Sequence, residues 1–472
     1  MMWQQFTPEL YHFAAALLFT ALSMTRRVDN RRDYWVALSL AGGGLIVCLA
    51  AVRAEGLLFL NTYKVDLFAQ LFKVLLSMGL FLVVALCSEL NGVARRWHSE
   101  FYLLLFTCTL AMMLLVSSVH LISIYVSLEL SSYSLYVLVA LRRDAAMGTQ
   151  AALRYFLIGI FSSAIMLFGL ALLYAATGLT YLSDLVQVLP GVIDQPLVLV
   201  AVVLTLGGFF FKLALFPFHF WAPDVYVGAP NQLAAFIATA SKVAAVAVLL
   251  RVVAATGGQE TLLVDSLAAL AIISMTVGNL AALVQKDFKR LLAYSSIAQA
   301  GYVLIGILCM SPEGADAAIF YALALLLMKF TCFLAVVKIA ADGGNPSLDA
   351  LAGLHRRSPL LALALMMAVF ALAGIPPTIG FTAKLLVFSA AMHKGYLVLV
   401  LIAMFNVVIS LYYYLLIVKA AYLTEPAVET PAPVLSLSAR ALTTALIIAI
   451  VVVGFYPNPL IVMARQASSS LF

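Results

Sequence analysis

The chain has 472 residues, of which 65% are hydrophobic and only 10% are charged, and its formal net charge is +6. With a mean hydropathy of +1.09, it has far too little polar surface to fold as a soluble globule. Composition therefore excludes a soluble enzyme and indicates a protein that crosses the lipid bilayer many times. We expect the excess positive charge to set the orientation of the chain, and nothing in its distribution indicates nucleic-acid binding.

A helix needs roughly 20 apolar residues to cross the hydrocarbon core, and this template predicts an all-α fold with about fourteen transmembrane helices. The expected spans lie near residues 7–24, 34–53, 67–89, 99–116, 118–140, 151–176, 196–220, 229–253, 262–284, 291–310, 314–341, 359–390, 396–423 and 438–462.

Basic residues are unevenly divided between the two sets of loops. No Lys or Arg precedes the first apolar run and no small-residue cleavage site follows it, so we expect no cleaved signal peptide. Seventeen of the 27 Lys and Arg lie in loops that follow odd-numbered spans, and five lie on the other side. The positive-inside rule then places both termini on the non-cytoplasmic side of a bacterial-type inner (plasma) membrane.

Motifs for cofactor chemistry are not visible in the sequence. The five cysteines lie in apolar spans without the spacing of a metal site, and we interpret them as small core residues. No Gly-rich phosphate loop or nucleotide motif is present. We therefore expect this chain to bind no metal, flavin, nicotinamide or iron–sulfur cluster.

Five lysines lie inside the predicted spans, where a charge at mid-bilayer costs at least about 2.5–3.5 kcal/mol. Such groups must face the bundle interior or a water-filled cavity. Lys73 is nearer a span end, from which it can extend to the interface, and we assign it no role. The four that we interpret as candidate proton carriers are Lys212, Lys242, Lys329 and Lys384.

Glu129 alone among the acidic residues lies at the middle of a predicted span. At helical spacing the same helix carries the polar side chains Tyr125, Ser132, Tyr133 and Tyr136. This stripe is expected to face protein. Glu129 is then either a structural carboxylate that ties two helices together or a working group in proton transfer.

Lys212 has no anion nearby in its own helix, so we expect it to pair with Glu129 across the bundle. At an effective dielectric constant near 20, unit charges about 4 Å apart attract by roughly 4 kcal/mol, and at about 7 Å by roughly 2.4 kcal/mol. A change of a few ångströms in their separation would therefore decide whether the lysine keeps its proton. The alternative is a static buried ion pair.

Pro217 is expected to break the seventh span and to free backbone carbonyls. Such breaks are tolerated in a membrane only where protein or cavity water satisfies the backbone, and they recur around ion paths. In the amphipathic segment that follows, His219 is either a proton relay from the cytoplasmic side or an ordinary interfacial histidine.

Lys242 is flanked by small residues that let helices and water approach, so it is a candidate intermediate proton station, with simple packing as the alternative. Ser295, Gln299 and Tyr302 follow one another at i, i+4 and i+7, which predicts a hydrated or hydrogen-bonded face on the tenth span. Lys329 lies about midway along the eleventh span.

A second break is predicted in the twelfth span, where Pro376 and Pro377 precede Lys384. Broken spans five apart indicate a duplicated five-span unit, spans 4–8 and 9–13, and an odd repeat length makes the copies inverted in the membrane. We therefore expect three N-terminal helices (1–98), a first repeat (99–253), a second, inverted repeat (262–423) and a C-terminal helix (438–472).

Together these residues resemble a known family. The chain resembles the antiporter-like, proton-translocating subunits of respiratory complex I. The resemblance rests on Glu129, the run KLALFPFHFWAPDVYVGAP with Lys212, Lys242, the run NLAALVQKDFKRLLAYSSIAQAGY, and GIPPTIGFTAKLLVF with Lys384. That family is related to Mrp-type cation/proton antiporters. The resemblance covers about spans 4 to 13 and is strongest to subunit N, because the chain ends soon after span 14 and has Lys384 where subunit M usually has a glutamate.

The resemblance implies roles and partners. Glu129 and Lys212 would form a modulating pair, Lys242 would bridge to a central polar axis, and Lys384 would face an outlet half-channel. The partners implied are antiporter-like M and K-type subunits of a membrane arm in the lipid bilayer. Quinone, FMN, iron–sulfur clusters and NAD or another electron donor would be handled by other subunits.

Lys329 departs from the pattern of subunit N, in which a neutral residue, often Asn, is expected. It either adds a proton station or marks a divergent complex whose electron input is not the usual NADH module. Two other functions are kept as alternatives: a subunit of a cation/proton antiporter complex without redox coupling, and a structural spacer with no proton path. The cost of keeping several buried charges argues against the spacer.

Overall fold

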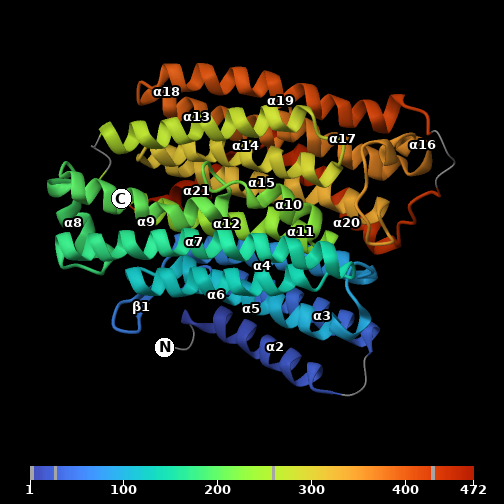
Figure 1. Cartoon of the computed structure of the whole chain (residues 1–472), viewed down its shortest axis with the longest axis horizontal. Coiled ribbons are helices and arrows are strands. Elements are labelled where there is room, and N and C mark those ends of the chain that lie inside the picture. The colour runs from blue at the N-terminus through green and yellow to red at the C-terminus, as the bar shows by residue number, and fades with distance from the viewer. Residues whose placement is uncertain (1–4, 26–28, 258–260, 427–430, 472) are drawn as a thin grey trace.

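The computed structural model describes residues 5–25, 29–257, 261–426 and 431–471. Within these ranges the chain is an all-α polytopic membrane protein with one short hairpin of strands β1 (Gly56–Leu58) and β2 (Tyr63–Val65). The axes of most of the long helices are roughly aligned with one another and lie horizontally in Figure 1.

The helices of the first half of the chain are α2 (Thr7–Ser23), α3 (Asn30–Ala50), α4 (Leu67–Ala85), α5 (His98–Ser117), α6 (Leu121–Ala140), α7 (Ala145–Thr177), α8 (Leu182–Val192), α9 (Pro196–Leu213), α10 (Trp221–Gly228), α11 (Asn231–Ala238) and α12 (Ala240–Ala254). Those of the second half are α13 (Thr261–Leu283), α14 (Phe288–Leu308), α15 (Pro312–Ile339), α16 (Leu354–Arg357), α17 (Pro359–Ala373), α18 (Ile379–His393), α19 (Leu397–Leu423), α20 (Leu437–Phe455) and α21 (Asn458–Ser468). Short 3₁₀ helices are η1 (Leu86–Glu89), η2 (Arg95–Trp97) and η3 (Asp349–Leu351).

A helix, or a pair of helices at a break, lies at each stretch that was expected to cross the membrane. Among the described residues, twelve helices are long and apolar enough to do so. Helix α2 has 17 residues, and α17 and α18 have 15 each, so these three are shorter than a full span. The short helices α8, α10, α16 and α21 were not expected from the sequence.

Helix starts follow from local sequence. Asp66, Asp144 and Asp287 immediately precede α4, α7 and α14, and each carboxylate accepts a backbone N–H from the first turn. A carboxylate at this position satisfies a free donor and interacts favourably with the helix dipole. Helices α9, α15 and α17 instead begin with proline, which needs no N–H there.

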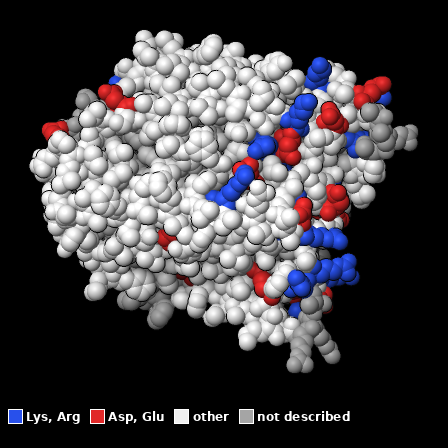
Figure 2. All heavy atoms as spheres, viewed as in Figure 1, with Lys and Arg blue, Asp and Glu red and all other residues white. Residues whose placement is uncertain are grey.

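The innermost helices are α11, α12, α14 and α15, whose side chains are almost all buried, whereas α3 and α20 lie at the periphery. Charged side chains gather at the end of the bundle where α2 ends and α3 begins, on the right of Figure 2, and a row of them reaches the middle of the visible face, whereas few lie on the left. In the folded bundle, one end therefore carries more charged side chains than the other. Which end faces the cytoplasm stays a prediction.

The first predicted break is present after α9. Ala214 adopts a left-handed conformation with φ of 59°, and the Phe216–Pro217 peptide bond is cis. Two carbonyls of the last turn of α9 accept side-chain donors: Phe211 O accepts the Trp221 indole N–H at 2.9 Å, and Leu213 O accepts Lys242 Nζ. The freed backbone is therefore satisfied by protein groups, as a break inside a membrane requires.

The second predicted break is present between α17 and α18. Gly374 has φ of 86°, a conformation that glycine adopts without steric cost, and the Pro376–Pro377 bond is cis. Lys384 Nζ donates to Leu372 O and Ala373 O, both at 2.9 Å. A lysine thus satisfies freed carbonyls at both breaks.

The eighth span is also interrupted, which the sequence did not predict. Thr239, with φ of −117° and ψ of −87°, separates α11 from α12. The interruption lies three residues before Lys242, so this lysine sits in the first turn of a new helix at the centre of the bundle.

Candidate functional site

Lys212 lies on α9 and Glu129 lies on α6, and the two side chains do not form a direct ion pair. Lys212 Nζ donates to Ser131 Oγ at 2.9 Å and to Ser132 Oγ at 3.0 Å. The Glu129 carboxylate instead accepts a hydrogen bond from Ser163 of α7. The two charges are therefore not in direct contact, and the change in their separation that we expect stays a prediction.

The serines explain the separation. Ser131 and Ser132 follow Glu129 within one turn of α6 and offer nearer acceptors to the ammonium group, while Ser163 draws the carboxylate toward α7. The two charges are still within electrostatic reach of each other, and both side chains are buried. Ser132 belongs to the polar stripe that the sequence predicted, whereas Ser131, two residues after Glu129, lies outside that stripe and was missed.

Lys242 is joined to the same break as Lys212. Its Nζ donates to Leu213 O at 2.5 Å, and Leu213 is the next residue after Lys212. A small cavity of about 10 Å³, lined by Lys242, Leu213 and Thr239 among others, lies beside this contact. That volume is at the lower limit for a cavity that holds one water molecule. Lys242 is also within electrostatic reach of Lys329.

Lys329 begins an unbroken series of hydrogen bonds. Its Nζ donates to Leu292 O at 3.0 Å and to Ser295 Oγ at 2.7 Å. Ser295 Oγ lies 2.5 Å from the Tyr414 hydroxyl, which accepts Gln299 Nε2 at 3.3 Å. The predicted polar face of α14 therefore contacts both α15 and α19.

The series continues to Lys384. Gln299 Nε2 also donates to Leu372 O at 3.1 Å, the carbonyl that accepts Lys384 Nζ. The ammonium group of Lys384 lies 4.9 Å from the centre of the Tyr302 ring, a cation–π distance. Ser295, Gln299 and Tyr302, which were predicted from their spacing alone, thus all lie between Lys329 and Lys384.

His219 lies outside this series. Its ring packs on Phe216 at 5.7 Å and on Phe220 at 4.1 Å between centroids. Its Nδ1 atom is buried and has no hydrogen-bond partner in the described part of the chain. No described contact joins it to the lysines, so its role as a relay stays a prediction.

Several residues of the site were missed in the sequence. Tyr414 connects Ser295 to Gln299, and Asn279 accepts the Tyr413 hydroxyl at 3.0 Å and donates to Asn406 Oδ1 at 3.1 Å. A signal for them existed, because Asn279 and Asn406 are polar groups inside apolar spans. Their partners lie more than a hundred residues away, so spacing along one helix could not connect them.

Buried cations also position α10 and the turn into α11, which lie between the break after α9 and the break at Thr239. Arg142 donates to Val227 O at 2.6 Å and to Ala229 O at 2.9 Å, and Lys289 donates to Ala229 O at 2.8 Å. Lys289 was counted as a loop cation, but it is fully buried in α14. Positive charge at the carbonyl end of α10 interacts favourably with the helix dipole and fixes the turn into α11.

The site can therefore be described as a buried lysine series formed by Lys212, Lys242, Lys329 and Lys384. Hydroxyl, amide and backbone groups join Lys329 to Lys384, Lys242 contacts the carbonyl next to Lys212, and no member has a carboxylate within ion-pair distance in the described residues. Ionisable residues arranged in series inside a membrane mark proton pathways.

Removing the Tyr414 hydroxyl tests the connection. Because Tyr414→Phe keeps the ring and deletes only the link between Ser295 and Gln299, we expect proton movement through the protein to slow about threefold, the effect of losing one modest hydrogen bond. The measurement is proton uptake into vesicles that contain the assembled complex.

Tyr412→Phe is the matched control, since this tyrosine lies two residues away on α19 with an exposed side chain. Equal rates for the two variants would remove Tyr414 from the series.

Comparison with known proteins identifies the family. The family model described as "NADH:quinone oxidoreductase/Mrp antiporter, TM" matches residues 118–410. The chain is 60% identical over 471 residues to NADH-quinone oxidoreductase subunit N 2 of Syntrophobacter fumaroxidans, covering 100% of both chains. This chain belongs to the NADH:quinone oxidoreductase/Mrp antiporter family.

Solved structures place the family fold on the whole chain. A chain of respiratory complex I from Thermus thermophilus shares 35% identity with a TM-score of 0.85, covering 97% of this chain and 99% of that one. A chain of the Mrp complex from a Dietzia species has a TM-score of 0.89 at 22% identity, covering 100% of this chain and 98% of that one, which shows the shared fold alone. The predicted family is confirmed.

Proposed function

We propose that this chain is the N-type, proton-translocating subunit of the membrane arm of a complex I-type NADH:quinone oxidoreductase. The high identity to subunit N relatives supports the complex. The observation that carries the proton role is the continuous set of contacts from Lys329 through Ser295, Tyr414, Gln299 and Leu372 O to Lys384.

In the proposed mechanism, a signal from redox chemistry elsewhere in the complex changes the separation of Glu129 and Lys212. Lys212 has two sets of acceptors, the serine hydroxyls that it contacts and the carboxylate within its electrostatic reach. A movement of the Lys212 ammonium group from the serine hydroxyls toward the Glu129 carboxylate changes how strongly Lys212 holds its proton. Moving one charge against 100 mV requires about 2.3 kcal/mol, similar to the roughly 2.4 kcal/mol of a pair about 7 Å apart.

Lys242 and Lys329 respond in turn. Lys242 is bonded to the carbonyl adjacent to Lys212 and senses the charge of Lys329, so a charge change at the first break reaches the second half of the series. Lys329 is thus an additional station, and Lys384 releases the proton outward. Residues 99–253 and 262–423 would act as two inverted repeats, each with one broken span.

The redox chemistry belongs to partner subunits in this proposal. Quinone, FMN, iron–sulfur clusters and NAD or another donor would be bound there, and this chain would contribute to a translocase without a redox site of its own. Its neighbours would be M-type and K-type membrane-arm subunits. Both termini would lie on the non-cytoplasmic side of the inner membrane.

Copurification tests the assignment against an antiporter without redox coupling. A tagged chain extracted in mild detergent should bring down subunits that contain flavin and iron–sulfur clusters, measured by flavin fluorescence and iron content. Recovery of small membrane subunits alone would instead establish the antiporter.

A further inference from the structure

Lys73, which had no predicted role, forms an ion pair deep in the N-terminal helices. Its Nζ lies 2.8 Å from Glu9 Oε1, and both side chains are fully buried. The Tyr63 hydroxyl donates to the same carboxylate oxygen at 2.7 Å, and the Tyr63 ring lies 5.2 Å from the ammonium group. The pair joins α2 to α4 and lies outside the buried lysine series. Burying two charges for structure alone brings little stability.

Several buried polar atoms around the pair have no hydrogen-bond partner in the described part of the chain. They are Glu9 Oε2, His12 Nε2, Gln70 Oε1, Gln70 Nε2 and Ser77 Oγ. Two of them converge, since a Cβ added to Gly44 would lie 3.0 Å from His12 Nε2 and 3.4 Å from Ser77 Oγ. Buried polar groups in native proteins are almost always hydrogen-bonded, and a cluster of unpaired ones indicates bound water.

A polar stripe along α4 leads from this cluster to the surface. Asp66, Gln70, Lys73 and Ser77 follow at i, i+4, i+7 and i+11, so they share one face of the helix, and all are buried. Asp66 lines a surface hollow of about 390 Å³ together with Lys64 and Ser470. This hollow lies at the end of the bundle where β1 and the C-terminus are found (Figure 1).

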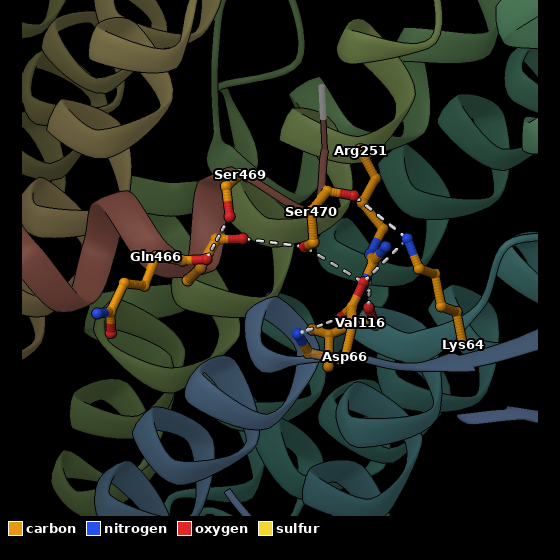
Figure 3. Close-up of polar contacts among 9 residues, drawn as sticks. Lys64, Asp66, Val116, Arg251, Gln466, Ser469 and Ser470 are labelled. Atoms are coloured by element: carbon orange, nitrogen blue, oxygen red, sulfur yellow. Dashed lines mark hydrogen bonds and ion pairs between the residues drawn. The ribbon is translucent and has the colours of Figure 1, made fainter. Parts of the chain in front are cut away.

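Asp66 stays charged at the mouth of the stripe. Figure 3 shows it between Arg251 and Lys64, at 2.6 Å and 3.4 Å. Burial opposes its ionisation, but the Arg251 guanidinium, the Ala69 N–H and the Lys64 ammonium group together outweigh that effect and hold the pKa of the Asp66 carboxyl below its usual value. Arg251 and Lys64 balance this negative charge, and Asp66 places a charged, polar group at the start of the stripe beside the hollow.

We propose that Glu9, Lys73 and the unpaired polar atoms around them form a second, hydrated proton-binding site, which exchanges protons with the surface hollow at Asp66. A proton from water passes Gln70 and binds the Glu9 carboxylate, and the site changes from a neutral pair to a net charge of +1. The proton returns to water by the same route. His12 and Tyr63 lie next to the carboxylate and accept or donate the hydrogen bonds that change with its charge.

The site is mechanically connected to the helix of Lys242. Arg251 at the end of α12 pairs with Asp66 at the start of α4, and a Cβ added to Gly79 of α4 would lie 2.9 Å from Ala240 Cβ. A charge change beside α4 therefore acts on the helix that carries Lys242. This consequence rests on the proposed function, whereas the existence of the site does not.

The double variant Glu9→Gln/Lys73→Met tests the proposal in the intact complex reconstituted into vesicles. It removes both charges while nearly conserving side-chain volume, so a purely structural pair is replaced at little cost to assembly. We expect the assembled double variant to take up at least about twofold fewer protons per quinone reduced, because α4 no longer carries a charge change that acts, through Asp66 and Arg251, on the helix of Lys242. A normal ratio of protons to quinone in the assembled variant would overturn the proposal.

Gln70→Leu keeps the inference testable if the double variant does not assemble. It leaves the Glu9–Lys73 pair in place and closes the stripe with an apolar side chain of similar size. We expect a comparable loss of proton uptake, and an unchanged ratio would overturn the proposal. Thr109→Val is the control, because Thr109 is equally buried in α5 but its hydroxyl bonds only its own helix, at Leu105 O.

These experiments distinguish a failure of the second proton-binding site from a failure of the proposed function. If Lys242→Met stops proton uptake while Gln70→Leu and the double variant are normal, the second site is refuted and the lysine series stands. If Lys242→Met is normal, the proposed function fails, and infrared detection of protonated Glu9, lost in Glu9→Gln, still decides whether the second site exists.

Discussion

Replacing Lys242 with methionine is expected to lower proton uptake by reconstituted vesicles about 100-fold, the usual loss when a positioned proton-transfer group is removed. The reason is its position at the junction of the two halves of the site. It contacts Leu213 O at the first break and is within electrostatic reach of Lys329. Methionine fills nearly the same volume between α12 and its neighbours but binds no proton.

The measurement is the initial rate of proton uptake on addition of the electron donor, at equal amounts of assembled complex. Lys394→Met is the matched control, because Lys394 is exposed at the end of α18 and belongs to no described contact of the site. Normal uptake by the Lys242 variant in a correctly assembled complex would remove this residue from the proton path.

Replacing Glu129 with glutamine is expected to slow proton uptake about tenfold or more. Glutamine keeps the size of the side chain and a carbonyl oxygen that accepts the Ser163 hydroxyl, so only the charge is lost. An attraction of roughly 2.4 kcal/mol for a separation of about 7 Å would be removed from Lys212, which is more than a tenfold effect on the occupancy of its charged state. The assay is the one used for Lys242.

Glu129→Asp retains the charge and should recover part of the rate. Glu89→Gln is the control for loss of a carboxylate, since Glu89 is exposed at the end of η1. If Glu129→Gln takes up protons as fast as Glu89→Gln does, Glu129 is a structural carboxylate held by Ser163, the alternative that the sequence left open.

The contacts of Glu129 and Lys212 show where inference from sequence stops. That the two residues face each other across neighbouring helices was predicted because each is too costly to leave in lipid. Which atoms they contact depends on Ser131, Ser132 and Ser163, whose hydroxyls offer nearer partners. Short polar side chains that bond across helices leave little pattern in one sequence.

The polar face of α14 shows the opposite case. Ser295, Gln299 and Tyr302 were found from their spacing, because a helix places residues four and seven apart on one side. Their partners Tyr414 and Leu372 O come from α19 and α17. The spacing therefore located one wall of the site, and the packing of three helices completed it.

The sequence by itself determined the membrane class, the positions of the spans, the polarity of charge between the two ends of the bundle, and the breaks at Pro217 and at Pro376–Pro377. These features are local, because they depend on the length of apolar runs, the placement of Lys and Arg, and the missing N–H of proline. Only the tertiary structure decided how the lysines connect, the break at Thr239, and the burial of Glu9 against Lys73. These depend on which helices become neighbours, and residues as distant as Glu9 and Lys73 meet only once the bundle has packed.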